Sequence, residues 1–198
     1  MMRVDLEMVI PWIEPGSRVL DLGCGDGTLL HHLKNERQVK GYGLEIDQNN
    51  VIAAIDKGVN VIQGDLDEGL SKYFDDDSFD YVVMTQTLQA VQRPDILLRE
   101  MLRIGREGIV TFPNMGYWKN RLQLLAGRMP VTRTLPYAWY NTPNIHLCTL
   151  LDFEDLCRQL NIRITTATVV NHAHQRTLLS RLRPNLFGEI AVYRLSRG

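Results

Sequence analysis

The chain has almost no net charge and lacks long hydrophobic runs. Its 22 lysines and arginines nearly balance 23 acids, which gives a formal net charge of −1. A balance of this kind says nothing about partners by itself, but the arginines near the C-terminus are not interleaved with stacking aromatics, which disfavours nucleic acid. No stretch approaches the ~20 apolar residues of a membrane helix. Four residues near the N-terminus also interrupt any signal-peptide core: Arg3, Asp5, Glu7 and Pro11. We therefore expect a cytoplasmic protein that binds neither membranes nor nucleic acid.

Cysteine is also scarce. Cys24, Cys148 and Cys157 are odd in number and lack the spacing of metal ligands. This pattern favours reduced thiols over a disulfide framework, and we expect no metal site. The hydrophobic fraction of 44% and the length of 198 residues suit one globular domain with a sizeable core.

An apolar run, a glycine-rich turn and a helical pattern follow one another in Val19–Leu30 (VLDLGCGDGTLL). This layout brings a backbone close to a nucleotide-type ligand. Gly23 and Gly25 carry no Cβ and can adopt positive φ, so the turn can be sharp and a cofactor can pack against it. A dinucleotide fingerprint needs G-x-G-x-x-G, but the third glycine is Gly27 and position 28 is threonine. The spacing therefore disfavours a nicotinamide cofactor.

Strands and helices alternate through the first 112 residues, which predicts a parallel sheet with right-handed crossovers. A ligand of such a sheet binds outside the carboxyl ends of the strands. The glycine turn, Glu45, Asp65 and Thr85 should meet there. The expected strands are 18–22, 39–46, 59–63, 79–85 and 108–112, and the expected helices end near residues 36, 57 and 103. A short helix over 3–13 should cover one edge of the sheet.

The periodicity weakens after Asn114, and residues 128–149 have the pattern of a long loop. A loop of this length in a compact domain usually has a function, so we expect a lid over the ligand or, alternatively, aromatic side chains that only pack the loop down. Further on, Asp152 should cap a helix that ends at Leu160. Strands near 163–170 and 189–195 should complete seven strands, the last of them antiparallel. We expect one domain over 1–198, comprising a cofactor-binding core (1–112), a lid or substrate-side insertion (113–150) and a sheet-completing end (151–198).

The run Asp21–Gly27 (DLGCGDG) resembles the first motif of class I S-adenosylmethionine-dependent methyltransferases. Three further runs fall in register with that family: Gly41–Asp47 (GYGLEID), Val61–Asp65 (VIQGD) and Ser78–Met84 (SFDYVVM). The resemblance implies a Rossmann-like α/β fold with a seven-stranded, mostly parallel sheet, an antiparallel last strand and helices on both faces. It also implies S-adenosylmethionine or S-adenosylhomocysteine as the cofactor.

The resemblance assigns a role to each acid. Glu45 would accept hydrogen bonds from the vicinal ribose hydroxyls, a charge-assisted pairing. Asp21 would hold the turn and attract the amino group of the methionine part. Asp65 would read the adenine amino group, or else cap a turn. The expected cofactor-binding residues are Asp21, Gly23, Cys24, Gly25, Gly27, Glu45, Ile46, Gly64, Asp65, Leu66 and Thr85.

No residue stands out as a catalytic base. Methyl transfer is an in-line displacement on an activated electrophile, so alignment supplies much of the acceleration. A base is needed only for acceptors that must lose a proton; the candidates are His146, Tyr117 and Tyr140. The segment Thr85–Thr87 lacks the Asn/Asp-Pro-Pro-aromatic signature, which disfavours nucleobase methylation.

Two more runs, Ser78–Gln92 (SFDYVVMTQTLQAVQ) and Trp139–His146 (WYNTPNIH), make the whole chain resemble the MetW family of methionine biosynthesis. The resemblance implies a homoserine O-acyltransferase as partner. The chain would then be a partner or regulatory subunit with a cofactor pocket. Alternatively, it is an active methyltransferase on a small, anionic molecule. Seven arginines from Arg158 onward form either a solvated face or a docking surface.

Overall fold

The computed structural model describes residues 2–171 and 178–198. It contains a seven-stranded sheet with the order β3-β2-β1-β4-β5-β7-β6. β1 to β5 pair with one another in parallel, whereas β7 runs antiparallel to both β5 and β6. The strands are β1 (Arg18–Leu22), β2 (Lys40–Glu45), β3 (Asn60–Gln63), β4 (Phe79–Thr85), β5 (Gly105–Pro113), β6 (Ile162–Val170) and β7 (Ile190–Arg197).

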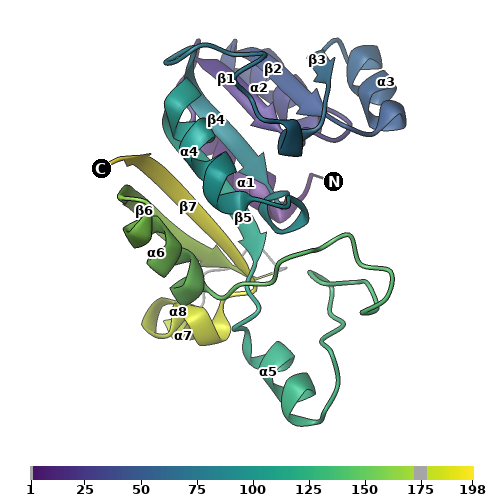
Figure 1. The fold of residues 1–198 in the computed structure, drawn as a ribbon, viewed down its shortest axis with the longest axis vertical. Coiled ribbons are helices and arrows are strands. Elements are labelled where there is room, and N and C mark those ends of the chain that lie inside the picture. The colour runs from purple at the N-terminus through teal and green to yellow at the C-terminus, as the bar shows by residue number, and fades with distance from the viewer. Residues whose placement is uncertain (1, 172–177) are drawn as a thin grey trace.

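Helices lie on both faces of the sheet (Figure 1). The longer ones are α2 (Thr28–Arg37), α3 (Gln48–Asp56), α4 (Pro94–Ile104), α5 (Trp118–Leu125) and α6 (Leu150–Gln159). The shorter ones are α1 (Val4–Val9), α7 (Leu178–Leu182), α8 (Pro184–Phe187) and the 3-10 turns η1 (Ile10–Trp12), η2 (Leu66–Glu68) and η3 (Leu88–Ala90). The predicted fold class is confirmed.

β4 shows why the sheet is covered on both sides. Its side chains alternate between two hydrophobic clusters: Val82 and Met84 join one, and Tyr81 and Val83 join the other. Successive strand residues point to opposite faces, so a strand with apolar side chains on both faces needs a layer on each face. The cluster with Met84 includes side chains of α4 and α6, and the one with Val83 includes side chains of α1, α2 and α3.

The N-terminal helix corrects one prediction. Leu6 and Val9 of α1 are buried in the cluster that contains Val83 and Ile109 from the middle of the sheet. α1 therefore covers a face of the sheet and not an edge. Asp5 of this helix is fully buried, where it accepts a hydrogen bond from the Thr111 hydroxyl at 3.0 Å.

The start of α6 corrects the prediction that Asp152 caps this helix. Thr149, not Asp152, is the N-cap: its hydroxyl accepts the backbone N–H of Asp152, and the Asp152 carboxylate accepts the backbone N–H of Thr149. This reciprocal pair is a capping box. The predicted loop over residues 128–149 is confirmed, whereas α7 and α8 were not predicted.

None of the described helices is long and apolar enough to cross a membrane. The expected cytoplasmic location and the division into core, insertion and sheet-completing end stay predictions. In this division, the insertion corresponds to the segment between β5 and α6. We call residues 114–149 the extension; α5 is its one helix among the described residues.

Candidate functional site

The glycine turn after β1 is fixed by the end of β2. The backbone N–H groups of Gly23 and Cys24 both donate to the Leu44 carbonyl, at 2.8 and 3.2 Å. Gly23 has a φ of +72°, and a Cβ there would lie 2.6 Å from the Thr87 hydroxyl oxygen. Both the conformation and the contact require glycine. Around Gly25, by contrast, a Cβ would meet nothing within 4 Å, so the turn is open on that side.

Glu45, the last residue of β2, binds the same turn with its side chain. One carboxylate oxygen accepts the Gly25 N–H at 2.8 Å, and the other accepts the N–H groups of Ile46 and Asp47 at 3.0 and 2.9 Å. The side chain is 8% exposed. Glu45 thus ties the glycine turn to β2, a function that we had assigned to Asp21.

Asp21 lies in β1, two residues before Gly23, and is 1% exposed. Its Oδ1 atom is buried without a hydrogen-bond partner among the described residues. Burial raises the pKa of this carboxyl to about 7, and the nearby Arg3 guanidinium partly opposes that rise. A buried acid that lacks a partner is costly. It suits a site that receives a cationic or hydrogen-bond-donating ligand.

Arg3 supplies a positive charge above Asp21 and was not predicted as a site residue. Its guanidinium pairs with the buried Asp5 at 2.8 Å and donates to the Thr85 carbonyl at 3.3 Å. α1 is therefore anchored at the carboxyl end of β4. The sequence held no signal for this contact, because it joins residues that are 82 positions apart.

Two hollows meet at Gly23. One, of about 260 Å³, contains Arg3, Asp21 and Thr85 in its wall. The other, of about 490 Å³, contains Glu45 and Asp65. Ten of the eleven predicted cofactor residues line one or both of them: Asp21, Gly23, Cys24, Gly25, Glu45, Ile46, Gly64, Asp65, Leu66 and Thr85.

The exception is Gly27, which lines neither hollow. It has a φ of +72°, and a Cβ there would lie 3.0 Å from the Ala54 side chain and 3.1 Å from that of Val59. Its role in the structure is to let the first turn of α2 pack against α3. Beside it, Asp26 pairs with Lys57, whose hydrogen bond lowers the pKa of the Asp26 carboxyl.

Asp65 has the turn-cap role that the sequence offered as one of two alternatives, and the adenine role stays a prediction. It is the N-cap of η2, where one carboxylate oxygen accepts the Asp67 N–H at 2.9 Å. The same residue lines the larger hollow, together with Leu66 and Gly64. The hydrogen bond of the turn cap orients the carboxylate. The second carboxylate oxygen takes no part in this cap.

The loop after β4 closes the larger hollow on its far side. Gln86 and Thr87 line that hollow and were not predicted as cofactor residues. Gln86 has a φ of +54°, unusual for a residue with a side chain, and its N–H donates to the Thr111 carbonyl at 2.9 Å. Strained backbone of this kind is common at ligand sites.

The structure does not bring the three candidate bases together. Tyr140 is 74% exposed. Tyr117 is buried, and burial, followed by the Glu189 carboxylate, raises its pKa to about 12, so it is a neutral phenol at physiological pH. His146 lines a separate hollow of about 80 Å³, and its Nε2 atom lies 3.2 Å from the Gln92 carbonyl oxygen.

The cysteines are unpaired, as predicted. Burial raises the pKa of Cys24, Cys148 and Cys157, to about 12 for the last two. Their thiols are therefore protonated and poor metal ligands at neutral pH. No group of three or more histidine, cysteine or acidic side chains that could hold a metal occurs among the described residues.

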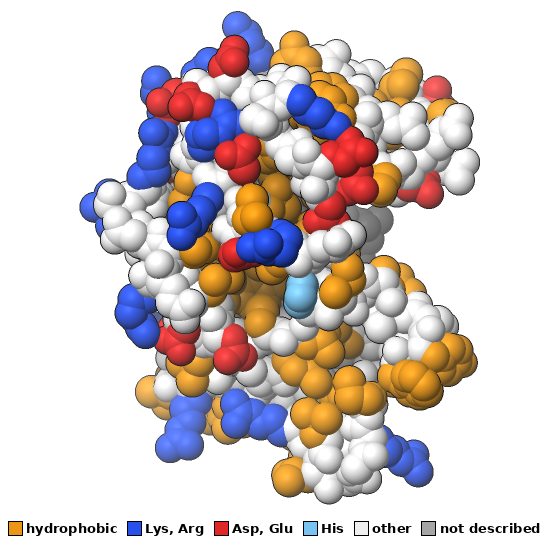
Figure 2. All heavy atoms as spheres, in the orientation of Figure 1, with side chains coloured by type: hydrophobic (Ala, Val, Ile, Leu, Met, Phe, Trp, Pro, Cys, Tyr) orange, Lys and Arg blue, Asp and Glu red, His pale blue; other side chains and the backbone are white. Residues whose placement is uncertain are grey.

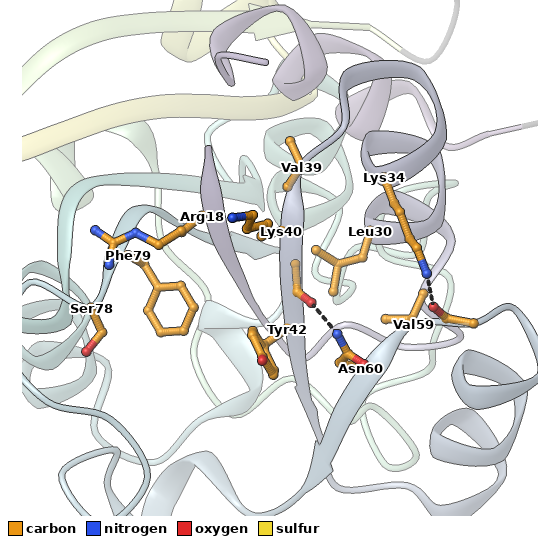
Figure 3. A pocket seen from close by; sticks show the side chains of 12 residues that line it. Arg18, Leu30, Lys34, Val39, Lys40, Tyr42, Val59, Asn60, Ser78 and Phe79 are labelled. Carbon is orange, nitrogen blue, oxygen red and sulfur yellow. Dashed lines mark hydrogen bonds between the residues drawn. The ribbon is translucent and has the colours of Figure 1, made fainter. Parts of the chain in front are cut away.

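A further hollow, of about 510 Å³, lies at the other end of the parallel strands, where they begin (Figure 3). Its wall includes the first residues of four strands: Arg18, Lys40, Asn60 and Phe79. Two of its cations already have partners, because Arg18 pairs with Asp80 at 3.4 Å and Lys34 donates to the Gly58 carbonyl at 2.8 Å. Ligands of parallel sheets bind at the carboxyl edge, so we place the candidate site there.

The sheet order, the glycine turn after β1 and the acid that ends β2 define a class I methyltransferase-like fold. A solved S-adenosylmethionine-dependent methyltransferase of Mesorhizobium loti has the same fold. It aligns with a TM-score of 0.71 at 16% identity, over 98% of this chain and 98% of that one.

The chain belongs to the MetW family: the family model described as "Methionine biosynthesis protein MetW" matches residues 3–195. The chain is also 37% identical, over 99% of its length, to the bifunctional methionine biosynthesis protein MetXA/MetW of Rhodopirellula baltica, and spans 33% of that longer protein. The C-methyltransferase UbiE of ubiquinone and menaquinone biosynthesis from Vibrio vulnificus is 27% identical over 93% of the chain, which spans 69% of UbiE.

Proposed function

We propose that the two hollows that meet at Gly23 bind S-adenosylmethionine. The buried Oδ1 of Asp21, which has no hydrogen-bond partner in the described part of the chain, lies at the smaller one and would face the ammonium group of the methionine part. Glu45 and Asp65 line the larger one, which would hold the ribose and the adenine. A small charged hollow beside a larger one matches a ligand with a zwitterionic end and a nucleoside end.

The hydrogen bonds of Glu45 refine its proposed role. A carboxylate offers about four lone-pair sites, and three of them accept backbone N–H groups. We infer that Glu45 accepts one ribose hydroxyl on the oxygen that also binds Gly25, and not two. The cofactor would thereby be bound to the same carboxylate that fixes the glycine turn.

We infer further that the chain acts with a homoserine O-acyltransferase as a partner or regulatory subunit. The observation that carries this proposal is the relative that joins MetXA and MetW in one polypeptide, because fusion keeps two proteins at a high effective concentration. S-Adenosylmethionine is made from methionine, so its pocket on such a subunit would report the output of the pathway to the acyltransferase.

The direct test measures homoserine acylation by the acyltransferase of the same cell, with and without this protein. We expect a gain in rate and co-elution of the two proteins, and a change in rate when S-adenosylmethionine is added. A gain in rate that does not change when S-adenosylmethionine is added would contradict the sensor role but not the partner role. No gain and no co-elution would contradict the partner role.

The second candidate function is methyl transfer to a small, anionic molecule. The observation in its favour is the 27% identity to a C-methyltransferase over nearly the whole chain. This function requires conversion of S-adenosylmethionine to S-adenosylhomocysteine in the presence of an acceptor. It draws no support from the three candidate bases, none of which lines the two hollows.

A further inference from the structure

The extension differs from the rest of the molecule in charge. Residues 114–149 contribute four of the 22 lysines and arginines but none of the 23 acids. The four cations are Lys119, Arg121, Arg128 and Arg133. The extension is therefore a basic segment in a chain whose net charge is −1; the C-terminal segment with the seven arginines is another.

The extension also exposes apolar surface. Eleven of the twenty large hydrophobic side chains exposed among the described residues belong to it, although it makes up less than a fifth of the chain. Leu125 is 84% exposed, and Trp139 is 74% exposed. Figure 2 shows hydrophobic side chains gathered over α5 and the loop that follows it. An apolar area of this kind on a protein surface marks an interaction site.

Polar anchors hold this surface in shape. At its beginning, the Asn114 side chain donates to the Asn185 and Gly188 carbonyls at 3.0 and 2.9 Å. In its middle, the Gln123 side chain accepts the Val131 N–H at 3.1 Å and donates to the Val131 carbonyl at 3.3 Å. The apolar side chains are thus left facing outward on a backbone that is already ordered, which lowers the entropic cost of binding.

The end of the extension is bound to the cofactor side of the sheet. The Gln89 carbonyl accepts the N–H groups of both Ile145 and His146, at 2.7 and 3.0 Å. Pro143 lines the same hollow as Glu45 and Asp65. These contacts join the two runs that carry the MetW resemblance, and they place the end of the extension next to the proposed cofactor site.

We propose that the apolar, basic surface of the extension, residues 118–147, is the docking site for the homoserine O-acyltransferase. This inference rests on the proposed partner role and adds the surface through which it acts. The occupant is a protein with an acidic rim around an apolar patch, because the extension offers cations and large apolar side chains but no acid. Exposed Trp and Arg are the residue types that dominate such interfaces.

The C-terminal arginines are the competing surface. Most of those in described segments already have partners: Arg158 pairs with Asp155, Arg163 donates to Ser196, and Arg194 and Arg197 pair with Glu107 and Asp77. Arg176 lies outside the described residues. Arg181 and Arg183 therefore provide the direct comparison.

The experiment measures the dissociation constant of the complex with the purified acyltransferase for four forms of the full chain. They are the wild type, the double variant L125A/W139A, the charge reversal R181E/R183E, and I55S on α3 as the control. Ile55 is 57% exposed, and its helix α3 lies at the other end of the molecule from α5 (Figure 1). We expect L125A/W139A to bind at least 30-fold more weakly, and the other two variants to bind as the wild type does.

Thermal unfolding and S-adenosylmethionine binding of each variant show whether it is folded; both side chains are too exposed to support the core. Wild-type affinity in L125A/W139A would overturn this inference and leave the partner role standing. Weakened binding of R181E/R183E alone would place the interface on α7. Failure of the wild type to bind would contradict the partner role itself.

Discussion

Asp21 is the residue whose chemistry depends most on its surroundings. Burial raises its pKa from the ordinary 3.8 to about 7. The unfolded chain therefore loses this proton near pH 4, whereas the folded chain keeps it until about pH 7. Without ligand, the free energy of unfolding should fall as pH rises through this window, by up to about 1.4 kcal/mol per pH unit, and level off above it.

D21N tests this prediction, since asparagine has the same shape and no titration. Urea unfolding at pH 5, 6, 7 and 8 should show the stability difference between variant and wild type shifting towards the variant as pH rises. A difference that stays constant with pH would contradict the raised pKa. At pH 8 the variant should also bind S-adenosylmethionine more weakly, because it lacks the charge.

We expect Glu45 to contribute both to S-adenosylmethionine binding and to the conformation of the glycine turn. E45A should cost about 1.5–3 kcal/mol of S-adenosylmethionine binding, the usual worth of a hydrogen bond to a charged group. E45Q should not restore it, because an amide NH2 would face the N–H groups of Gly25 or of Ile46 and Asp47. Calorimetric titration gives both values, with the exposed Glu68 changed to alanine as the control. Unchanged affinity in E45A would show that the ribose is bound elsewhere.

At the scale of one element, the capping box of α6 gives a clean stability prediction. Removal of an N-cap hydroxyl costs about 1 kcal/mol, so T149A should lower the midpoint of thermal unfolding by ~2–4 °C. T149S keeps the hydroxyl and should retain most of the stability. Equal loss in both variants would mean that the threonine methyl group, and not the cap, stabilises the helix.

The strands and most helices could be predicted because their signals are local. The apolar run before Gly23 and the acid after Leu44 define their own elements. The position of α1 was not accessible in this way, since it depends on Asp5 reaching Thr111, 106 residues further on. The extension is similar: it has no period of its own, and its shape follows from anchors such as Asn114 and the Gln89 carbonyl.

For the candidate site, the sequence predicted most of the residues of the glycine turn and the strand ends that line the two hollows. It did not predict Arg3, Gln86 and Thr87, which line them too. Arg3 reaches the site through α1. Gln86 carries no glycine signal despite its positive φ, and no local pattern indicates that Thr87 packs against Gly23.

For the whole molecule, the separation of charge predicts how a complex should respond to salt. If the basic extension meets an acidic partner, association should slow several-fold between ~50 and ~300 mM NaCl, because screening shortens the reach of the charges. Dissociation should change less, since the apolar contacts are not screened. Stopped-flow mixing measures both rates, and R128E/R133E should show a weaker dependence on salt. An association rate that does not change with salt concentration would indicate that the apolar side chains alone make the contact.

The place of β7 has a consequence for the order of folding. This strand spans residues 190–197, yet it pairs with β5 on one side and β6 on the other. During synthesis, the five parallel strands can assemble early, but the edge of β5 stays unpaired until residue 197 has left the ribosome. β6 cannot join the sheet before then. Contacts so distant in sequence form slowly, and the bare apolar strand is prone to aggregation meanwhile. The unfinished sheet is thus the state in which this chain most needs a chaperone.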